Sequence, residues 1–262
     1  METPGVWAGA WVVFTIAAAV LQTARNAMQS SLTRTLGTLG ATHVRFLYGL
    51  PFSLVFLAVV GSVVGGGWPS PTPSFFAWVA IGGLTQIAAT ALMLAAMREQ
   101  SFVVATAYVK TEPIQVAVFG LVFLGDRLGP LASAAVLVST IGVVAMSWPK
   151  PGAAGETNRG SLRPALLGVA AGAMFAMASV GFRGAILALG EGSFVLHASV
   201  TLVAGLALQA ATLSLWLWLR DPAVLRGVVA AWRASVPAGL AGAAGFTNFS
   251  SSMGTFCRTS RI

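Results

Sequence analysis

The sequence predicts an all-α membrane protein, a bundle of helices that cross the bilayer several times. Hydrophobic residues make up 56% of the 262 residues and charged residues only 8%, whereas soluble domains average about 25% charged residues. The apolar residues fall into runs close to the ~20 residues that a helix needs to span the hydrocarbon. A soluble interior of this size cannot bury so much apolar surface. The chain is therefore expected to lie in a lipid bilayer as a multi-pass protein.

Eight apolar runs are expected to form helices, and the last is weaker than the others. Glycine and proline punctuate the chain between them, for example at 65–73 and 125–130, because these residues favour turns and stop helices. In chain order the runs cover residues 6–24, 43–64, 75–97, 101–124, 129–148, 163–184, 194–218 and 235–253. The chain starts without a basic segment or a cleavage site, so the first run is expected to be a retained helix.

The longest polar stretch, 149–162, is expected to be a linker between two parts of the chain. Five of the expected helices precede it, within a first part that covers 1–148. Three begin after it, and the second part is expected to cover 163–245. Residues 246–262 form a tail rich in serine and threonine that supplies no further apolar run. This ending suggests a truncated or frame-shifted C-terminus.

Two observations suggest that the second part is an inverted copy of the first. The segment 5–10, Gly-Val-Trp-Ala-Gly-Ala, is similar to 168–173, Gly-Val-Ala-Ala-Gly-Ala, although Gly/Ala-rich helices also match by chance. The loop after the second run has no basic residue, whereas its equivalent after the seventh run has three arginines. A unit of five helices crosses the membrane an odd number of times, so its copy is inverted and its loops carry the opposite charge bias. The same distribution of arginines places the N-terminus outside the cytoplasm.

Two opposite charges, Lys110 and Glu112, lie about halfway along the apolar run 101–124. A charge at the bilayer centre costs at least ~2.5–3.5 kcal/mol on insertion scales, so such residues usually face a cavity or a partner. Burial disfavours both charged forms, which makes either group a candidate for proton coupling or solute binding, Glu112 the better one. The alternative is a buried ion pair that only fixes the packing of helices.

Helical periodicity places Tyr108, Glu112 and Gln115 on one face of this run, with Lys110 about 200° away from Glu112. The two charges therefore cannot pair simply within the helix. Pro113 removes one backbone hydrogen bond and is expected to kink the helix, which frees a carbonyl toward the same cavity.

Other polar residues in or near the runs are weaker candidates for the same pathway. Gln86, midway along 75–97, suits the orientation of a polar solute, but it suits a hydrogen bond to a neighbouring helix equally well. Three arginines near helix ends either extend to the membrane surface or form a vestibule that attracts anions: Arg25, Arg45 and Arg183. His43 and His197 each open a helix and are expected at the membrane surface rather than in a reaction.

Composition and motifs argue against several classes of function. The net charge is +8, but the 13 arginines and 2 lysines are scattered between apolar runs and form no stripe that would follow a nucleic acid. A single cysteine, Cys257, excludes disulfides within the chain and cysteine-based metal clusters. No phosphate-binding loop, zinc motif or set of carboxylates at metal-ligand spacing is present. We expect no enzyme activity, no metal and no cofactor.

Three short segments resemble the EamA-type proteins of the drug/metabolite transporter superfamily. They are Arg25-Asn-Ala, Val44-Arg45-Phe-Leu-Tyr-Gly-Leu-Pro51-Phe, and Lys110-Thr-Glu-Pro-Ile-Gln115 followed by Leu121-Val-Phe-Leu-Gly-Asp126-Arg127-Leu. The last is similar to the family's Leu-Gly-Glu-Arg-Leu ending, with Asp126 in place of the usual glutamate. The architecture carries most of the resemblance, over roughly residues 6–245.

The resemblance implies ten helices in two inverted five-helix repeats, of which this chain supplies about eight. It also implies cytoplasmic termini, in conflict with the distribution of arginines, and a place in a bacterial cytoplasmic membrane. The expected function is secondary transport, in the direction of export, of a small solute such as a metabolite, an amino acid or a drug, with protons as a possible coupling ion. The alternative is an integral-membrane protein that transports nothing, either a membrane enzyme or a packing subunit, or else a non-functional fragment of a transporter.

Overall fold

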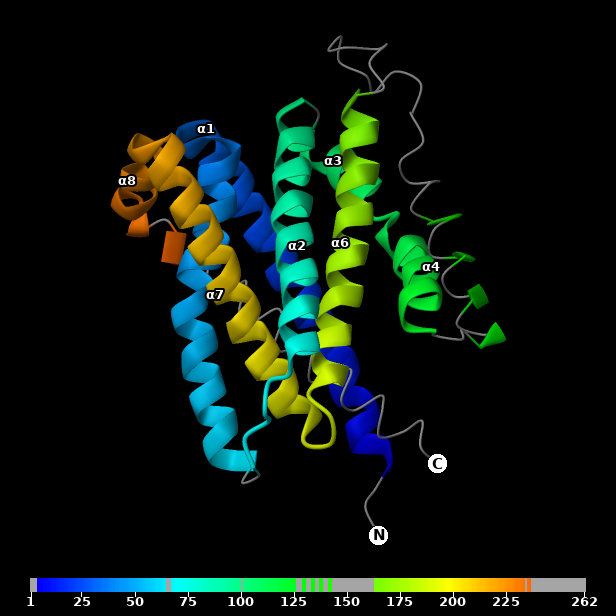
Figure 1. Cartoon of the computed structure of the whole chain (residues 1–262). Helices are drawn as coiled ribbons and strands as arrows, with labels where there is room; N and C mark the ends of the chain where they lie inside the picture. The colour runs from blue at the N-terminus through cyan, green and yellow to red at the C-terminus, as the bar shows by residue number, and fades with distance from the viewer. Residues whose placement is uncertain are drawn as a thin grey trace. The chain divides into compact units, whose positions relative to one another are not determined.

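The regular structure of the chain is helical throughout the part that a computed structural model describes (Figure 1). The described residues are 4–64, 67–99, 101–125 and 163–233, with 129–130, 133–134, 137–138, 141–142 and 235–236. Within them, five helices are long and apolar enough to cross a membrane. The all-α membrane class is therefore confirmed.

Several expectations fall largely or wholly outside the described residues. They are the runs 129–148 and 235–253, the linker 149–162 and the tail 246–262. The number of eight crossings and the inverted repeat consequently stay predictions.

The helices form two compact units, which are described separately. The first unit comprises Met1–Phe76 and Ala185–Ile262, the second Ala77–Gly184. The first holds helices α1 (Pro4–Val64), α7 (Phe194–Arg220) and α8 (Pro222–Ala230). The second holds α3 (Phe102–Val109), α4 (Glu112–Leu124) and most of α2 (Pro73–Glu99) and α6 (Arg163–Ala188).

Helix α1 is divided by a bend at Gly37 into two arms, 4–36 and 38–64. Gly37 has φ 69° and ψ 177°, a region of backbone conformation that is essentially restricted to glycine. The Gln29 side chain donates to the carbonyl of Ala41 at 3.3 Å, which ties the arms together next to the bend. The sequence-based expectation of a connection between 24 and 43 is therefore wrong, because helix continues to the bend on both sides.

Helix α8 packs on the bend of α1, and its position was not predicted from the sequence. Buried Val228 of α8 forms an apolar cluster with Leu36 and Val44 of α1. The Tyr48 hydroxyl donates to the Val228 carbonyl at 3.1 Å. The helix begins where the Asp221 side chain accepts a hydrogen bond from the Val224 amide, which satisfies one of the free donors of a first turn.

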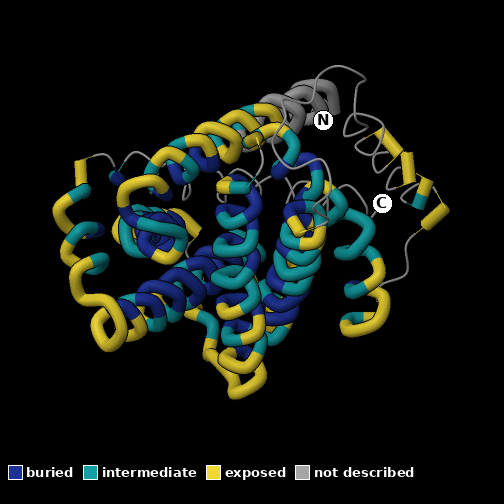
Figure 2. Tube along the Cα trace, turned by 90° about the horizontal axis from the view of Figure 1, so that it is seen from above, coloured by how far each residue is buried: buried dark blue, intermediate teal, exposed yellow. Residues whose placement is uncertain are grey.

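Close contact between α2 and α6 depends on glycine in the second unit. A Cβ atom built on Gly181 would lie 2.7 Å from the amide nitrogen of Gly82, and one built on Gly184 would lie 2.6 Å from the ring of Trp78. Neither position has room for a side chain, so small residues set the distance between these helices, as is common in membranes. Figure 2 shows that the helices carry buried residues on one side and exposed residues on the other.

Candidate functional site

The helix expected over 101–124 is interrupted at Lys110 and Thr111, near the middle of the candidate span Phe102–Leu124. At the end of α3 the Lys110 amide donates to the carbonyls of Thr106 and Ala107, at 3.2 and 3.1 Å. The Thr111 amide and hydroxyl both donate to the carbonyl of Tyr108, at 3.3 and 2.9 Å. These bonds tighten the last turn and end the helix.

Pro113 restarts the helix instead of only kinking it. It is the second residue of α4, where a missing N–H costs nothing because the first amides of a helix have no partner within it. In a continuous helix the residue at 113 would donate to the carbonyl of Val109, and proline has no proton to give. Lys110 and Thr111 thus interrupt a helix that was expected to be continuous, although Tyr108 and Gln115 still both lie against α6.

Three oxygen atoms of the α3–α4 junction gather against Gly172 of α6. A Cβ built on Gly172 would lie 3.0 Å from Oε1 of Gln115, 3.1 Å from Oγ1 of Thr111 and 3.1 Å from the Val109 carbonyl oxygen. One turn earlier on α6, a Cβ on Gly168 would collide with Cβ of Tyr108. The Gly168-xxx-Gly172 pair therefore holds α6 against both sides of the interruption.

The two charged residues lie at opposite ends of the interruption. Lys110 follows the C-terminal end of α3 and is exposed, whereas Glu112 is the first residue of α4 and is partly buried. A helix carries a partial negative charge at its C-terminus and a partial positive charge at its N-terminus. Each side chain thus stands at the helix end that favours its sign.

Polar atoms near the junction include two with no hydrogen-bond partner within the described part of the chain. They are Oγ1 of Thr106 on α3 and Oε1 of Gln115 on α4. Gln86 is partly buried within α2, where its carbonyl accepts from the hydroxyl of Thr90 at 2.9 Å. The second unit therefore contains Tyr108, Lys110, Glu112, Gln115 and Gln86. It brings Tyr108 against Gly168 of α6 and Gln115 against Gly172 of the same helix.

The three arginines proposed for a vestibule have unlike surroundings. Arg25 was expected near a helix end, but it lies inside the first arm of α1, 7% exposed, and donates to Oδ1 of Asn26 at 3.1 Å. Arg45 also lies within α1, with its guanidinium 5.4 Å from the ring centre of Phe46. Arg183 is exposed on α6, which continues to Ala188.

Buried polar residues of the first unit were missed by the sequence argument. His43 was expected at the membrane surface, but it is fully buried in the second arm of α1 and shares a 3.0 Å hydrogen bond with Ser214 of α7. His197 is also buried, near the start of α7. Gln29, Thr201 and Gln209 are fully buried in the same unit. For Thr201 and Gln209, a polar residue inside an apolar run was the signal, whereas Gln29 lies between two runs. The partners of such residues on other helices could not be inferred from spacing.

No cluster of three or more His, Cys, Asp or Glu that would suit a metal ion occurs within the described ranges. The described part of the site offers hydroxyl, amide, carbonyl, ammonium and carboxylate groups. These groups bind polar or charged organic molecules and exchange protons, and they lie inside a segment long enough to cross a membrane.

Comparison with known proteins identifies the chain through its first part. A solved structure titled "Crystal structure of protein" has a TM-score of 0.53 and 19% identity, and the match covers 95% of this chain and 84% of that one. This likeness shows a shared fold. No curated protein matches. Residues 9–148, more than half of the 262, match the EamA-like transporter family. The chain belongs to the EamA-like transporter family, and is an integral-membrane transporter of the drug/metabolite type.

Proposed function

We propose that this protein is a secondary transporter of a small organic solute and that the α3–α4 junction lines its transport path. The observation that carries the proposal is the interruption of a membrane-length segment between Lys110 and Glu112. Discontinuous helices form the solute and ion sites of many secondary transporters, because their ends present backbone groups and dipoles that a continuous helix hides.

A comparison of energies favours a functional role for the two charges. A charge near the bilayer centre costs at least ~2.5–3.5 kcal/mol, whereas a favourable helix end typically returns ~0.3–1 kcal/mol and at most ~2 kcal/mol. Helix ends therefore offset only part of the cost for Lys110 and Glu112. For the exposed Lys110, water or solute in the path supplies further stabilisation, so the junction is wet during part of the transport cycle.

Each residue of the junction has a definite part in this proposal. Glu112 binds a proton or the amine of a solute, and Lys110 binds an anionic group such as a carboxylate. Gln86, Tyr108 and Gln115 orient the solute through hydrogen bonds. The direction is export, driven by proton entry across a bacterial cytoplasmic membrane. A metabolite, an amino acid or a cationic drug carries groups that can pair with these charged and hydrogen-bonding side chains.

Proton movement in proteoliposomes tests the proposal. The purified chain is reconstituted with the dye pyranine inside, a pH gradient is imposed, and the twenty amino acids and a set of organic amines are added one at a time. We expect at least one compound to accelerate dissipation of the gradient with the wild type. The Glu112→Gln variant is expected to lose this acceleration, because an amide neither carries a proton nor attracts an amine.

Glu99→Gln provides a matched control. Glu99 lies at the end of α2 and forms a 3.3 Å ion pair with Arg163, so the same chemical change is made in the same unit but away from the junction. The control is expected to keep wild-type flux. Equal flux in wild type and Glu112→Gln would remove Glu112 from the coupling step, and no flux with any compound would favour a protein that transports nothing.

A further inference from the structure

Three exposed arginines surround the turn that joins α7 to α8. Arg220 ends α7, Arg226 lies on α8, and Arg233 follows that helix. The single acidic residue between 194 and 236 is Asp221, and its carboxylate accepts a hydrogen bond from the Val224 amide. This segment thus carries three guanidinium groups and one carboxylate, and the carboxylate caps α8. The surface carries a clear positive excess.

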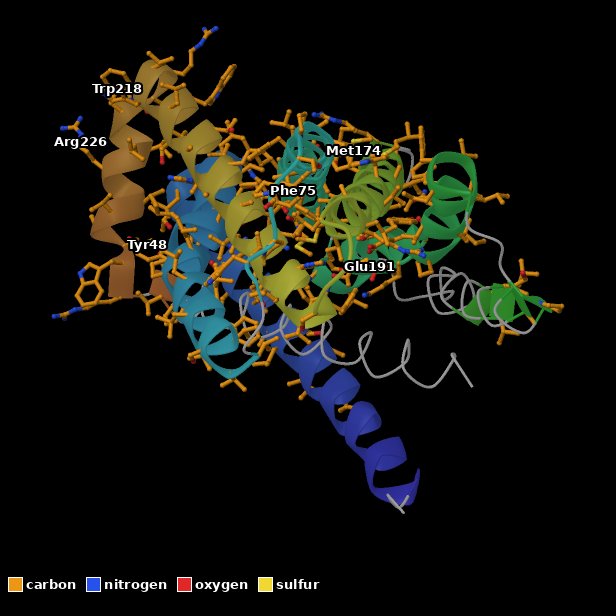
Figure 3. The ribbon with its side chains drawn as sticks, turned by 60° about the horizontal axis from the view of Figure 1, so that its bottom comes forward. Tyr48, Phe75, Met174, Glu191, Trp218 and Arg226 are labelled. Atoms are coloured by element: carbon orange, nitrogen blue, oxygen red, sulfur yellow. The ribbon has the colours of Figure 1, made fainter. Side chains whose placement is uncertain are left out.

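Exposed tryptophans lie beside these arginines. Trp216, Trp218 and Trp232 are 51%, 63% and 52% exposed. The guanidinium of Arg220 lies 5.4 Å from the ring centre of Trp216, and that of Arg233 lies 5.4 Å from the ring centre of Trp232. Figure 3 shows Trp218 and Arg226 at this end of the unit, with the guanidinium of Arg226 directed outward. Tryptophan gathers where membrane hydrocarbon meets the headgroups.

A hollow of about 410 Å³ opens next to the same turn. The bend of α1, residues 36–40, forms one side, and Trp216, Arg220 and Val224 contribute to the other. Exposed Arg34 lies three residues before Gly37 and adds a further positive charge near that wall. The hollow therefore combines two charged side chains, Arg220 and Asp221, with aromatic and aliphatic walls. The Asp221 carboxylate already accepts a hydrogen bond from the Val224 amide.

Together these observations select one kind of partner. A soluble anion or an acidic protein would match the arginines but would leave the tryptophans and the exposed Leu219 and Val229 in water. A lipid with an anionic headgroup matches both, because its phosphate meets the guanidinium groups and its chains meet the apolar residues. Helix α7 is itself a candidate span that ends at Arg220, which places the turn at the membrane surface.

We propose that the α7–α8 corner, defined as Trp216, Trp218, Arg220, Arg226, Trp232 and Arg233, binds the headgroup of an anionic phospholipid. Arg220 and its neighbours hold the phosphate at the mouth of the hollow, and the tryptophans lie along the lipid's glycerol and upper chain. The site is in the first unit and does not depend on the transport role of the junction.

Native mass spectrometry of the full chain in detergent tests the proposal. Dioleoylphosphatidylglycerol and dioleoylphosphatidylcholine are added at equal concentrations, and the bound fraction of each is measured at low and high ammonium acetate. We expect several-fold tighter binding of phosphatidylglycerol, and a smaller preference at high salt. The Arg220→Gln/Arg226→Gln variant is expected to lose about fivefold in preference per arginine removed.

Arg98→Gln is the matched control, because it removes an exposed arginine of α2 in the other unit. It is expected to keep the wild-type preference. If the double variant does not fold, Arg226→Gln alone serves, since its side chain points away from the ribbon (Figure 3). Equal binding of the two lipids by the wild type, an unchanged preference in the arginine variants, or full displacement of the lipid by 10 mM inorganic phosphate would overturn the proposal.

Discussion

Nε2 of His43 and Oγ of Ser214 lie 3.0 Å apart, although 171 residues separate them in the chain. His43 comes from the second arm of α1 and Ser214 from α7, so one hydrogen bond joins two membrane-length helices in the buried part of the first unit. His43 is fully buried and Ser214 partly buried, and a hydrogen bond of this kind helps to fix which faces of two helices meet.

Removal of this bond is expected to destabilise the protein modestly. Hydrogen bonds between membrane helices contribute about 0.6 kcal/mol on average and about 2 kcal/mol at most. Ser214→Ala should therefore lower the melting temperature in detergent by a few degrees. Ser62→Ala is the control, since the Ser62 hydroxyl is exposed and bonds only to a carbonyl of its own helix. A melting temperature that is equal in both variants would contradict the importance of the pair.

Gly172→Ala is expected to push α6 away from the α3–α4 junction. The new methyl group would lie within about 3.1 Å of three oxygen atoms, and overpacking of this kind costs about 1–3 kcal/mol. The variant should unfold at a lower temperature and should also transport more slowly, because the junction is displaced.

Gly142→Ala makes the same change where a Cβ meets no atom of the described residues within 4 Å. Alanine favours helix over glycine by about 1 kcal/mol, so this variant should be as stable as the wild type or slightly more so. Equal effects of the two substitutions would show that α6 can move without harm.

Gly37→Ala is expected to strain the bend of α1. Within the described part of the chain no atom lies within 4 Å of the added Cβ. The expected cost is therefore that of the backbone, about 1–3 kcal/mol for a conformation that suits glycine alone. Denaturation of the detergent-solubilised protein would measure it. Gly67→Ala, also with open space around the Cβ but outside the helices, is expected to change stability by less than ~0.5 kcal/mol; a loss as large as that of Gly37→Ala would refute the assignment of strain.

Pro113→Ala is expected to separate the role of the interruption from the role of the charges. Alanine has the backbone N–H that proline lacks, so residue 113 can donate a hydrogen bond to the Val109 carbonyl. The substitution leaves Lys110 and Glu112 in place. The helix should become more continuous, and helical signal in circular dichroism should rise slightly while solute-dependent proton flux falls. Wild-type flux in this variant would show that the charges act without the interruption.

Features of the fold that depend on composition could be predicted from the sequence. Features that depend on contacts between helices could not. Apolar runs predicted α2, α6 and α7 to within a few residues of their ends, because hydrocarbon thickness sets their length. The charges at 110 and 112 marked the interrupted helix, since they are costly in lipid. Periodicity could not predict that Thr111, Gln115 and Val109 meet Gly172, because that contact depends on which helix packs there.

Helix α8 and the bend of α1 were also missed because they depend on contacts between helices. Residues 25–42 carry arginine, threonine and serine, and their polarity suggested a connection, yet helix persists because neighbouring helices cover one of its faces. The segment 222–230 is short and mixes polar with apolar residues, so hydropathy did not predict a helix there. Their apolar side is visible only once Val228 is placed against Leu36 and Val44.

The bend at Gly37 also determines how the topology of this protein can be mapped. One residue separates the two helical arms, so at this bend there is almost no non-helical peptide for a protease or an antibody to reach. An epitope tag inserted there would have to unwind helix on both sides. A tag inserted at 67–72, where the backbone is not helical, would disturb no helix and should report which side of the membrane that loop occupies.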